Sequence, residues 1–208
     1  MQITGMLWGR KLLDLVEFPH SEVRGPELGV DDIKDMIKRH GQVFIKPLFK
    51  GGVGKKGKSG LLGRVDNITD ALKEKERLYF CEHVDGFSKV KSDGVTYEGA
   101  VPADYEVYFS ISESTEHRCP IMTVTHHGGV DIEELGEDKM KVVPFDALTG
   151  LKAFHVSNAL MELGAPPEVI SPLVQNLPKL WDLYNNYGML QLELNPIRMQ
   201  PGKGGRLA

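Results

Sequence analysis

The sequence has little cysteine and no long apolar run. Cys81 and Cys119 are the only cysteines among its 208 residues, and no pair has the CxxC spacing of a thiolate metal site. Two isolated thiols are typical of a reducing compartment. No stretch approaches the roughly 18 apolar residues that cross a membrane, and the N-terminus lacks the apolar core of a signal peptide. We therefore expect a soluble, cytoplasmic protein with unpaired cysteines and no membrane partner.

The chain also lacks a large excess of charge of one sign. Its formal net charge is −4, so its surface as a whole does not indicate nucleic-acid binding. The charges are unevenly distributed, however, because the segment 46–64 contains no acidic residue and six basic ones: Lys46, Lys50, Lys55, Lys56, Lys58 and Arg64. A cationic, glycine-rich segment in an acidic protein favours a small anionic ligand.

Hydrophobic periodicity predicts a mixture of helices and strands. The predicted helices are 31–41, 66–78 with Asn67 or Thr69 near its N-cap, 149–164, and 166–188 kinked or split by Pro172 and Pro178. The predicted strands are 42–47 ended by Pro47, 61–65, 95–101, 104–112 and 119–127 as a hairpin, and 189–197. Hairpins mixed with helices predict the α+β class, or a mixed α/β sheet.

The stretch "GGVGKKGKSG" (51–60) satisfies the phosphate-loop formula G-x-x-x-x-G-K-[ST]. A true P-loop continues directly into a helix, whose N-terminus binds the phosphates. Here Ser59 is followed by "GLLGRV", which favours a strand. We therefore favour a flexible hairpin whose lysines neutralise a polyphosphate, with Lys46 directed at the same ligand. A solvated basic turn without a ligand remains the alternative.

The segment "MLQLELNPI" (189–197) alternates apolar and polar residues. A strand places Gln191, Glu193 and Asn195 on one face. The opposite face would carry the leucines 190, 192 and 194. A carboxylate and an amide oxygen two residues apart suit Mg²⁺. The alternative is an edge strand with a wet polar face.

The segment "YEGAVPADYEVYF" (97–109) combines Glu98, a bend of small residues and Glu106. Backbone groups at the bend could contact a purine edge, and a following carboxylate could accept hydrogen bonds from ribose hydroxyls. The alternative is a strand, a bend and a surface glutamate.

The segment "THHGGVDIEEL" (125–135) contains His126 and His127. Adjacent histidines on a strand point to opposite faces, and no Cys or His partner stands at ligand spacing. We therefore interpret both as structural, and consider the Gly128–Gly129 turn more informative.

These segments, in this order, resemble the ATP-grasp domain of the nucleotide-binding subunit shared by succinyl-CoA synthetase, citryl-CoA synthetase and ATP-citrate lyase. The matching segments are "FIKP", "GKKGKSGLLG", "YEGAVPADYEVYF", "THHGGVDIEEL", "DALTGLKAF" and "LELNPI". The resemblance implies an ATP-grasp fold, in which two α+β subdomains clasp a nucleotide cleft. We expect these at 42–102 and 103–208, after a poorly matching segment at 1–41.

The resemblance implies roles for residues near the phosphates. Lys46 would contact the ATP phosphates, and Lys56 and Gly57 would belong to the loop over the triphosphate. Asn195 would be a ligand of Mg²⁺. Glu193 would lie close to the approaching acceptor histidine.

The resemblance also implies how the nucleoside is bound. Gly99 and Val101, next to Glu98, would meet adenine through their backbone, and Glu106 would bind the ribose. Departures from the family pattern include His127, where a glutamate often precedes the two glycines, and two glycines inserted before the lysine loop.

The implied function is an ATP-dependent, acyl-CoA-forming enzyme subunit. It would transfer the γ-phosphoryl group of Mg-ATP to a histidine on a partner domain or subunit, to activate citrate, or alternatively succinate, for thioester formation with coenzyme A. A hetero-oligomer is expected. The strand carrying a second Mg²⁺ carboxylate and the coenzyme-A-side domain are not among these 208 residues, so we expect a piece of a longer or split protein, inactive alone. A P-loop NTPase and a non-catalytic polyanion-binding module are the alternatives from other classes.

Overall fold

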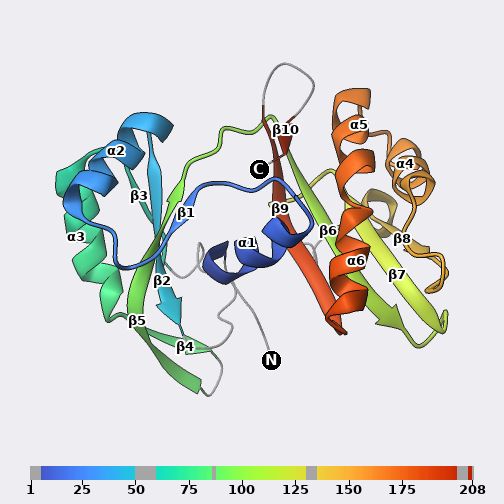
Figure 1. Ribbon diagram of the computed structural model, residues 1–208, viewed down its shortest axis with the longest axis horizontal. Helices are drawn as coiled ribbons and strands as arrows, with labels where there is room; N and C mark the ends of the chain where they lie inside the picture. Colours follow the sequence, from blue (N-terminus) through green and yellow to red (C-terminus); the bar gives the residue numbers. More distant parts are fainter. Residues whose placement is uncertain (1–5, 50–59, 86–87, 130–134, 201–205, 208) are drawn as a thin grey trace. The chain divides into compact units, whose positions relative to one another are not determined.

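The computed structural model describes residues 6–49, 60–85, 88–129, 135–200 and 206–207. Its helices and antiparallel sheets confirm the α+β prediction. The chain divides into two compact units (Figure 1). The first comprises residues 1–12 and 21–101, and the second comprises residues 13–20 and 102–208. The helix α1 (Met6–Leu15) contributes to both units. No helix in the described ranges is long and apolar enough to span a membrane.

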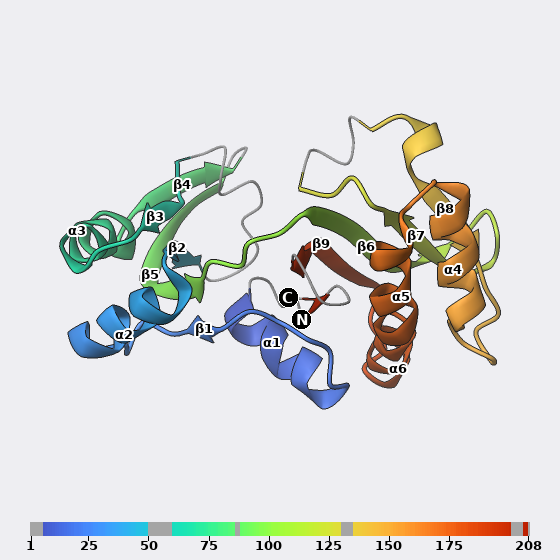
Figure 2. The same cartoon turned by 90° about the horizontal axis from the view of Figure 1, so that it is seen from above.

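The first unit is built on a five-stranded antiparallel sheet. Its strands follow the order β1 (Val23–Arg24), β5 (Ser88–Gly99), β2 (Val43–Phe49) and β3 (Gly63–Val65), with β4 (Glu82–Asp85) also paired to β5. Helices α2 (Val30–His40) and α3 (Ile68–Tyr79) lie on one side of this sheet (Figure 2). Ile33 and Met36 of α2 pack with Ile45 and Tyr97 of the sheet in a core from which water is excluded. Burial of these apolar side chains fixes which sheet face meets the helices.

Both predicted helices of this unit are confirmed, and so is the cap of α3. Asn67 is the N-cap, and its side chain accepts a hydrogen bond from the N–H of Asp70. The prediction that Pro47 ends the first strand is wrong, because β2 continues to Phe49. Proline has no N–H to donate to a neighbouring strand. β3 pairs with β2 only as far as Ile45, so Pro47 interrupts no β2–β3 pairing. Pro47 also lies next to an irregularity in the β2–β5 register.

The second unit is built on another five-stranded antiparallel sheet. Its order is β10 (Arg206–Leu207), β9 (Gln191–Gln200), β6 (Tyr105–Ser114), β7 (Cys119–Thr125) and β8 (Lys141–Pro144). Helices α4 (Ala153–Glu162), α5 (Pro167–Asn176) and α6 (Lys179–Asn186) lie together beside it (Figures 1 and 2). The predicted hairpin is confirmed, with Ser114 opposite Cys119 at its end. Cys81 and Cys119 form no disulfide.

Two helix predictions in this unit need correction. The helix expected to begin near residue 149 begins at Ala153, because Gly150 has φ +75°. A Cβ there would lie 2.4 Å from the indole of Trp181, so glycine is required for this turn. The stretch 166–188 is split at Pro178, whereas Pro172 stays inside α5. A single lost backbone hydrogen bond is therefore tolerated there.

The predicted alternation along β9 holds for only part of the strand. Leu190 precedes the strand and is 86% exposed, so its expected place on the apolar face is wrong. Leu192 is buried, but the next buried residues are Ile197 and Met199, on positions of opposite parity. Between the paired positions Val107–Ile197 and Phe109–Leu194, β9 has one residue more than β6. This bulge reverses which side chains face the core.

Candidate functional site

The first unit brings two predicted site residues, Lys46 and Glu98, into one ion pair. Glu98 on β5 is opposite Phe44 on β2, so Lys46 and Glu98 are diagonal neighbours on the sheet. Lys46 Nζ donates to Glu98 Oε2. The Glu98 side chain is only 10% exposed, and a carboxylate buried to this extent needs a cationic partner. Lys46 keeps 30% of its side chain exposed, so its ammonium group can also meet an anion from solvent.

The chain leaves this sheet at Gly99 and Ala100. The N–H of Gly99 donates to the carbonyl of Glu22 at 2.9 Å, and the N–H of Ala100 donates to the carbonyl of Gln42 at 2.9 Å. Val101 follows with its side chain 8% exposed. The backbone predicted to meet adenine is therefore anchored on both sides, and it directly follows the Lys46–Glu98 pair in the fold.

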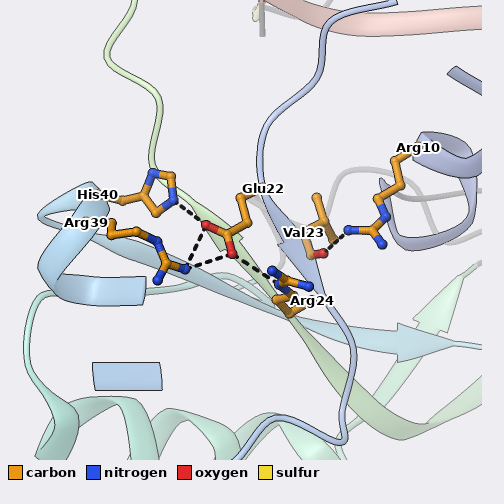
Figure 3. A network of polar contacts seen from close by, with 6 residues as sticks. All are labelled: Arg10, Glu22, Val23, Arg24, Arg39 and His40. Atoms are coloured by element: carbon orange, nitrogen blue, oxygen red, sulfur yellow. Dashed lines mark hydrogen bonds and ion pairs between the residues drawn. The ribbon is translucent and has the colours of Figure 1, made fainter. Parts of the chain in front are cut away.

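Glu22, whose carbonyl accepts from Gly99, is also part of a polar network that the sequence did not reveal (Figure 3). The Glu22 carboxylate accepts hydrogen bonds from Arg39 Nη2 at 2.8 and 3.0 Å and from Arg24 Nε at 3.1 Å, and lies 2.7 Å from His40 Nε2. Burial alone would raise the pKa of Glu22, but hydrogen bonds from His40, Arg39 and Arg24 outweigh it and lower the pKa to about 2. No local pattern marks Glu22, because Arg39 and His40 lie 17 and 18 positions away.

The lysine-rich loop carries Lys56 and Gly57, which lie outside the described residues. The described chain resumes at Gly60, whose carbonyl accepts a hydrogen bond from Arg77 Nη1 at 3.0 Å. β3 follows, and the next helix begins only at Ile68. A strand therefore follows the lysine-rich loop where a P-loop requires a helix. This agrees with our preference for a hairpin over a P-loop.

An open hollow of about 420 Å³ lies between β3 and α3, and it contains none of the predicted site residues that the structure describes. Its lining is Gly60, Leu62, Gly63, Arg64, Val65, Asp70, Lys73, Glu74 and Arg77. Arg77 pairs with Glu74 at 2.6 Å and Lys73 with Asp70 at 3.6 Å. These two cations are thus matched by carboxylates, whereas Arg64 donates to the Gln42 side-chain oxygen.

In the second unit, the Gly128–Gly129 turn brings Glu106 and Asn195 together. The N–H of Gly128 donates to the Glu106 carbonyl at 2.6 Å, and the N–H of Gly129 donates to Asn195 Oδ1 at 3.4 Å. Gly129 has φ +75°, and a Cβ there would lie 1.7 Å from Glu106 Oε2, so only glycine fits. Arg198 Nη2 lies 2.9 Å from Glu106 Oε1. The sequence placed these residues in separate segments, and the fold joins them in one cluster.

Glu193 lies on the same strand as Asn195, and both are exposed. Gln191 Nε2 donates to Glu193 Oε2 at 3.1 Å, as expected for alternate residues on one face. On the neighbouring strand, Ser110 pairs with Glu193. Burial raises the pKa of Tyr108, the Ser110 hydroxyl opposes this by hydrogen bonding, and the Glu193 charge adds to it.

We expected His126 and His127 to point to opposite faces of a strand, and this prediction is wrong. β7 ends at Thr125, and beyond it the two rings lie 4.1 Å apart. Burial, with a contribution from His127, lowers the pKa of His126, which favours its neutral form. Among the described residues, no group of three His, Cys, Asp or Glu side chains could hold a metal.

Glu193 and Asn195 nevertheless fit a magnesium ion that arrives with its ligand. They supply hard oxygen donors, exposed and two residues apart on β9. Mg²⁺ is usually bound by one or two protein groups together with waters and substrate phosphates, rather than by a full protein cage.

The family model for the ATP-grasp domain matches residues 19–199. This chain belongs to the ATP-grasp family. The ATP-grasp fold inferred from the resemblance is thereby confirmed. The match spans both units and includes the predicted site residues of each unit.

Two curated relatives of this ATP-grasp chain are succinate–CoA ligase β subunits. The ADP-forming subunit of Desulfatibacillum aliphaticivorans is 27% identical over 83% of this chain and 46% of its own length. The mitochondrial GDP-forming subunit of Dictyostelium discoideum is 28% identical over 80% of this chain and 43% of its own. The chain thus spans about half the length of the curated relatives it matches.

A similar solved structure is the ATP citrate lyase of Methanothrix soehngenii in complex with citrate and coenzyme A. It is 20% identical, covers 95% of this chain and 45% of its own, and superimposes with a TM-score of 0.67. This likeness supports the shared fold.

Proposed function

We propose that this chain is the nucleotide-binding part of an ATP-dependent, acyl-CoA-forming enzyme. It binds Mg-ATP and passes the γ-phosphoryl group to a histidine on a partner domain or subunit, and the phosphoryl group then activates a carboxylate for thioester formation with coenzyme A. The observation that carries the proposal is the cluster in which Gly128 and Gly129 join Glu106 to Asn195. The two residues that we propose to bind the ribose and the metal thus belong to one compact group, which supports the proposal.

The first unit provides the groups for the base and the phosphates. Lys46 contacts the phosphates, together with Lys56 and Gly57 of the loop, and Glu98 holds the Lys46 ammonium in place when the site is empty. Because phosphate carries more charge than one carboxylate, Lys46 can exchange part of its interaction with Glu98 for one with the ligand. Val101 contributes a backbone contact to adenine.

The second unit provides the ribose contact and the metal ligands. Glu106, which is paired with Arg198, accepts hydrogen bonds from the ribose hydroxyls. Asn195 is a ligand of Mg²⁺, and Glu193 lies beside the approaching histidine. When bound, the magnesium ion neutralises charge on the phosphates.

The transfer step itself needs positioning more than a reactive side chain. The bond between the γ-phosphorus and the bridging oxygen of ADP breaks as a bond to the histidine nitrogen forms, so ADP leaves and phosphohistidine remains. Phosphohistidine then donates the group to a carboxylate oxygen, and the coenzyme A thiolate displaces phosphate from the acyl phosphate. We propose citrate as the carboxylate, with succinate as the alternative that the two curated relatives favour.

Calorimetric titration of the chain with Mg-ATP tests the nucleotide site. We expect Lys46→Ala and Glu106→Ala each to weaken binding by about tenfold or more, because each removes a charge-assisted contact. Omitting Mg²⁺ should weaken binding of the parent chain as well.

Matched controls are available on each unit. Lys73 forms an exposed ion pair on α3, and Glu162 forms one with Lys141. Lys73→Ala and Glu162→Ala should bind Mg-ATP like the parent. If Lys46→Ala and Glu106→Ala do so too, the site assignment is wrong. If tripolyphosphate binds as tightly as ATP and binding falls steeply with salt, the chain is a polyanion-binding module instead.

A further inference from the structure

Gly60, where the chain emerges from the lysine-rich loop, is held by α3. The Gly60 carbonyl accepts a hydrogen bond from Arg77 Nη1 at 3.0 Å, and Arg77 lies in the last turn of α3. The next residue, Leu61, is 7% exposed and belongs to the core of the first unit. The chain is therefore fixed directly after the loop, at a point that the sequence marks with no motif.

Glu74 orients the guanidinium group of Arg77. Arg77 Nη2 donates to Glu74 Oε2 at 2.6 Å, and Arg77 Nε lies 3.1 and 3.0 Å from the two carboxylate oxygens. A guanidinium group that binds a carboxylate through two of its nitrogens has a defined orientation. Its third nitrogen, Nη1, is the one that donates to the Gly60 carbonyl.

Glu74 also lies directly against β3. A Cβ added at Gly63 would lie 2.6 Å from Glu74 Oε2 and 3.1 Å from two carbons of the same side chain. Gly63 is paired with Ile45 of β2, the residue before Lys46. The Glu74–Arg77 pair therefore connects α3 to the strand that follows the loop, and this strand is the neighbour of the one that carries Lys46.

We infer that Arg77, oriented by Glu74, is a positioning residue that fixes the end of the lysine-rich loop for binding of the outer phosphates of ATP. A segment held at its end has fewer conformations to lose on binding a ligand than one that is free there. The pair is partly exposed, with 47% of the Arg77 side chain accessible, so its contribution to the stability of the unit is small. The inference rests on the proposed function and adds two residues that act through the loop.

Calorimetric titration with Mg-ATP and with AMP tests the role of Arg77. The two ligands share the base, the ribose and one phosphate, and they differ in the outer phosphates and the magnesium ion. We expect Arg77→Ala to weaken Mg-ATP binding by about fivefold, the effect of one lost hydrogen bond, and to leave AMP binding unchanged. Unchanged Mg-ATP affinity would overturn the inference and leave the proposed function standing. An equal loss for both ligands would also overturn the inference, because it indicates a general effect on the fold.

Lys73→Ala is the matched control for the loss of a positive charge. Lys73 lies four positions earlier on α3 and pairs with Asp70 at 3.6 Å. Its removal leaves the hydrogen bond from Arg77 to the Gly60 carbonyl in place, so Lys73→Ala should bind Mg-ATP like the parent. If it loses as much affinity as Arg77→Ala, the effect is one of charge and the inference is wrong. Failure of the parent chain to bind Mg-ATP would overturn the proposed function, and the inference with it.

Glu74→Ala separates positioning from charge, because the two effects have opposite signs. Through charge alone, removal of a carboxylate near an anion site strengthens binding of the anion. The inference predicts weaker Mg-ATP binding instead, because Arg77 loses its orientation, and it predicts no further loss when Glu74→Ala is added to Arg77→Ala. Asp70→Ala removes a carboxylate from the same helix but keeps the Glu74–Arg77 pair, so it should not weaken binding. If Glu74→Ala binds Mg-ATP as tightly as the parent or more tightly, Glu74 does not position the loop through Arg77.

Discussion

Single charged residues at the candidate site are compensated by nearby partners. Glu98 is paired with Lys46, Glu106 with Arg198, and Glu22 with two arginines and a histidine. Apart from Glu22 and Arg24, which are two positions apart, the paired residues lie on different strands or on a helix and a loop, so the fold sets these partners.

The Glu22 network predicts a specific pH dependence of stability. The folded-state pKa of Glu22 is about 2, below its ordinary value of 4.5, so the folded chain resists protonation there. The stabilisation is therefore complete above pH 4.5 and is lost as the pH falls from 4.5 towards 2. Glu22→Gln should lower the free energy of unfolding by on the order of 2 kcal/mol at pH 7. In urea denaturation, its difference from the parent should shrink between pH 5 and pH 3.

The control is Glu74→Gln, which breaks the pair with Arg77 on α3. A difference between Glu22→Gln and the parent that does not change with pH would contradict the role assigned to the Glu22 carboxylate.

Gly129 supplies a second prediction for a single residue. Gly129→Ala adds a Cβ that collides with the Glu106 carboxylate, in a backbone conformation that disfavours alanine. Gly164 has a similar φ, +70°, but a Cβ there would meet nothing within 4 Å. Gly164→Ala should therefore lose only about 1 kcal/mol of unfolding free energy through backbone strain.

Gly129→Ala should lose more than that, and it should also lose Mg-ATP affinity, whereas Gly164→Ala should keep it. Chemical denaturation and calorimetry measure the two effects. If both variants bind Mg-ATP equally well, the Gly128–Gly129 turn does not position the nucleotide contacts.

At the scale of helices and strands, the sequence predicted those features that depend only on residues close together in the chain. The amphipathic helix at 31–41, the start of a helix near Asn67 or Thr69, and the β6–β7 hairpin followed from periodicity and turn residues. The β9 bulge and the late start of α4 did not, because they depend on the β6 partner strand and on Trp181. The short strands β1 and β4 were missed for the same reason, since pairing with β5 defines them.

The same limit applied to the candidate site. Motifs alone were enough to propose Lys46, Glu98, Glu106 and Asn195 as site residues, but their contacts within each unit came only from the fold. Glu22 carried no motif, because its partners Arg39 and His40 are distant in sequence.

The α3 cap gives a prediction at this scale. The sequence left Asn67 and Thr69 as alternatives, and the structure selects Asn67, whose side chain accepts from the N–H of Asp70 at 2.9 Å. Asn67→Ala should lower the free energy of unfolding by about 1 kcal/mol, because a helix donor loses its partner. Thr69→Ala should change it little. Equal losses in thermal or urea unfolding would contradict this assignment.

For the whole molecule, the account depends on residues from both units. Lys46 and Glu98 belong to the first unit, and Glu106 and Asn195 belong to the second. The ATP-grasp family match covers both, while the chain spans about half the length of its curated relatives. We therefore propose that the chain supplies nucleotide binding, and that the carboxylate and coenzyme A act elsewhere in the complete enzyme.

A crystal structure of the chain with Mn²⁺ and a non-hydrolysable ATP analogue tests this account most directly, because Mn²⁺ can be located by its anomalous scattering. The account predicts the ion within about 2.2 Å of Asn195 Oδ1. It also predicts Lys46 Nζ hydrogen-bonded to a phosphate of the same nucleotide. An analogue bound without Lys46, or an ion bound away from Asn195, would contradict it.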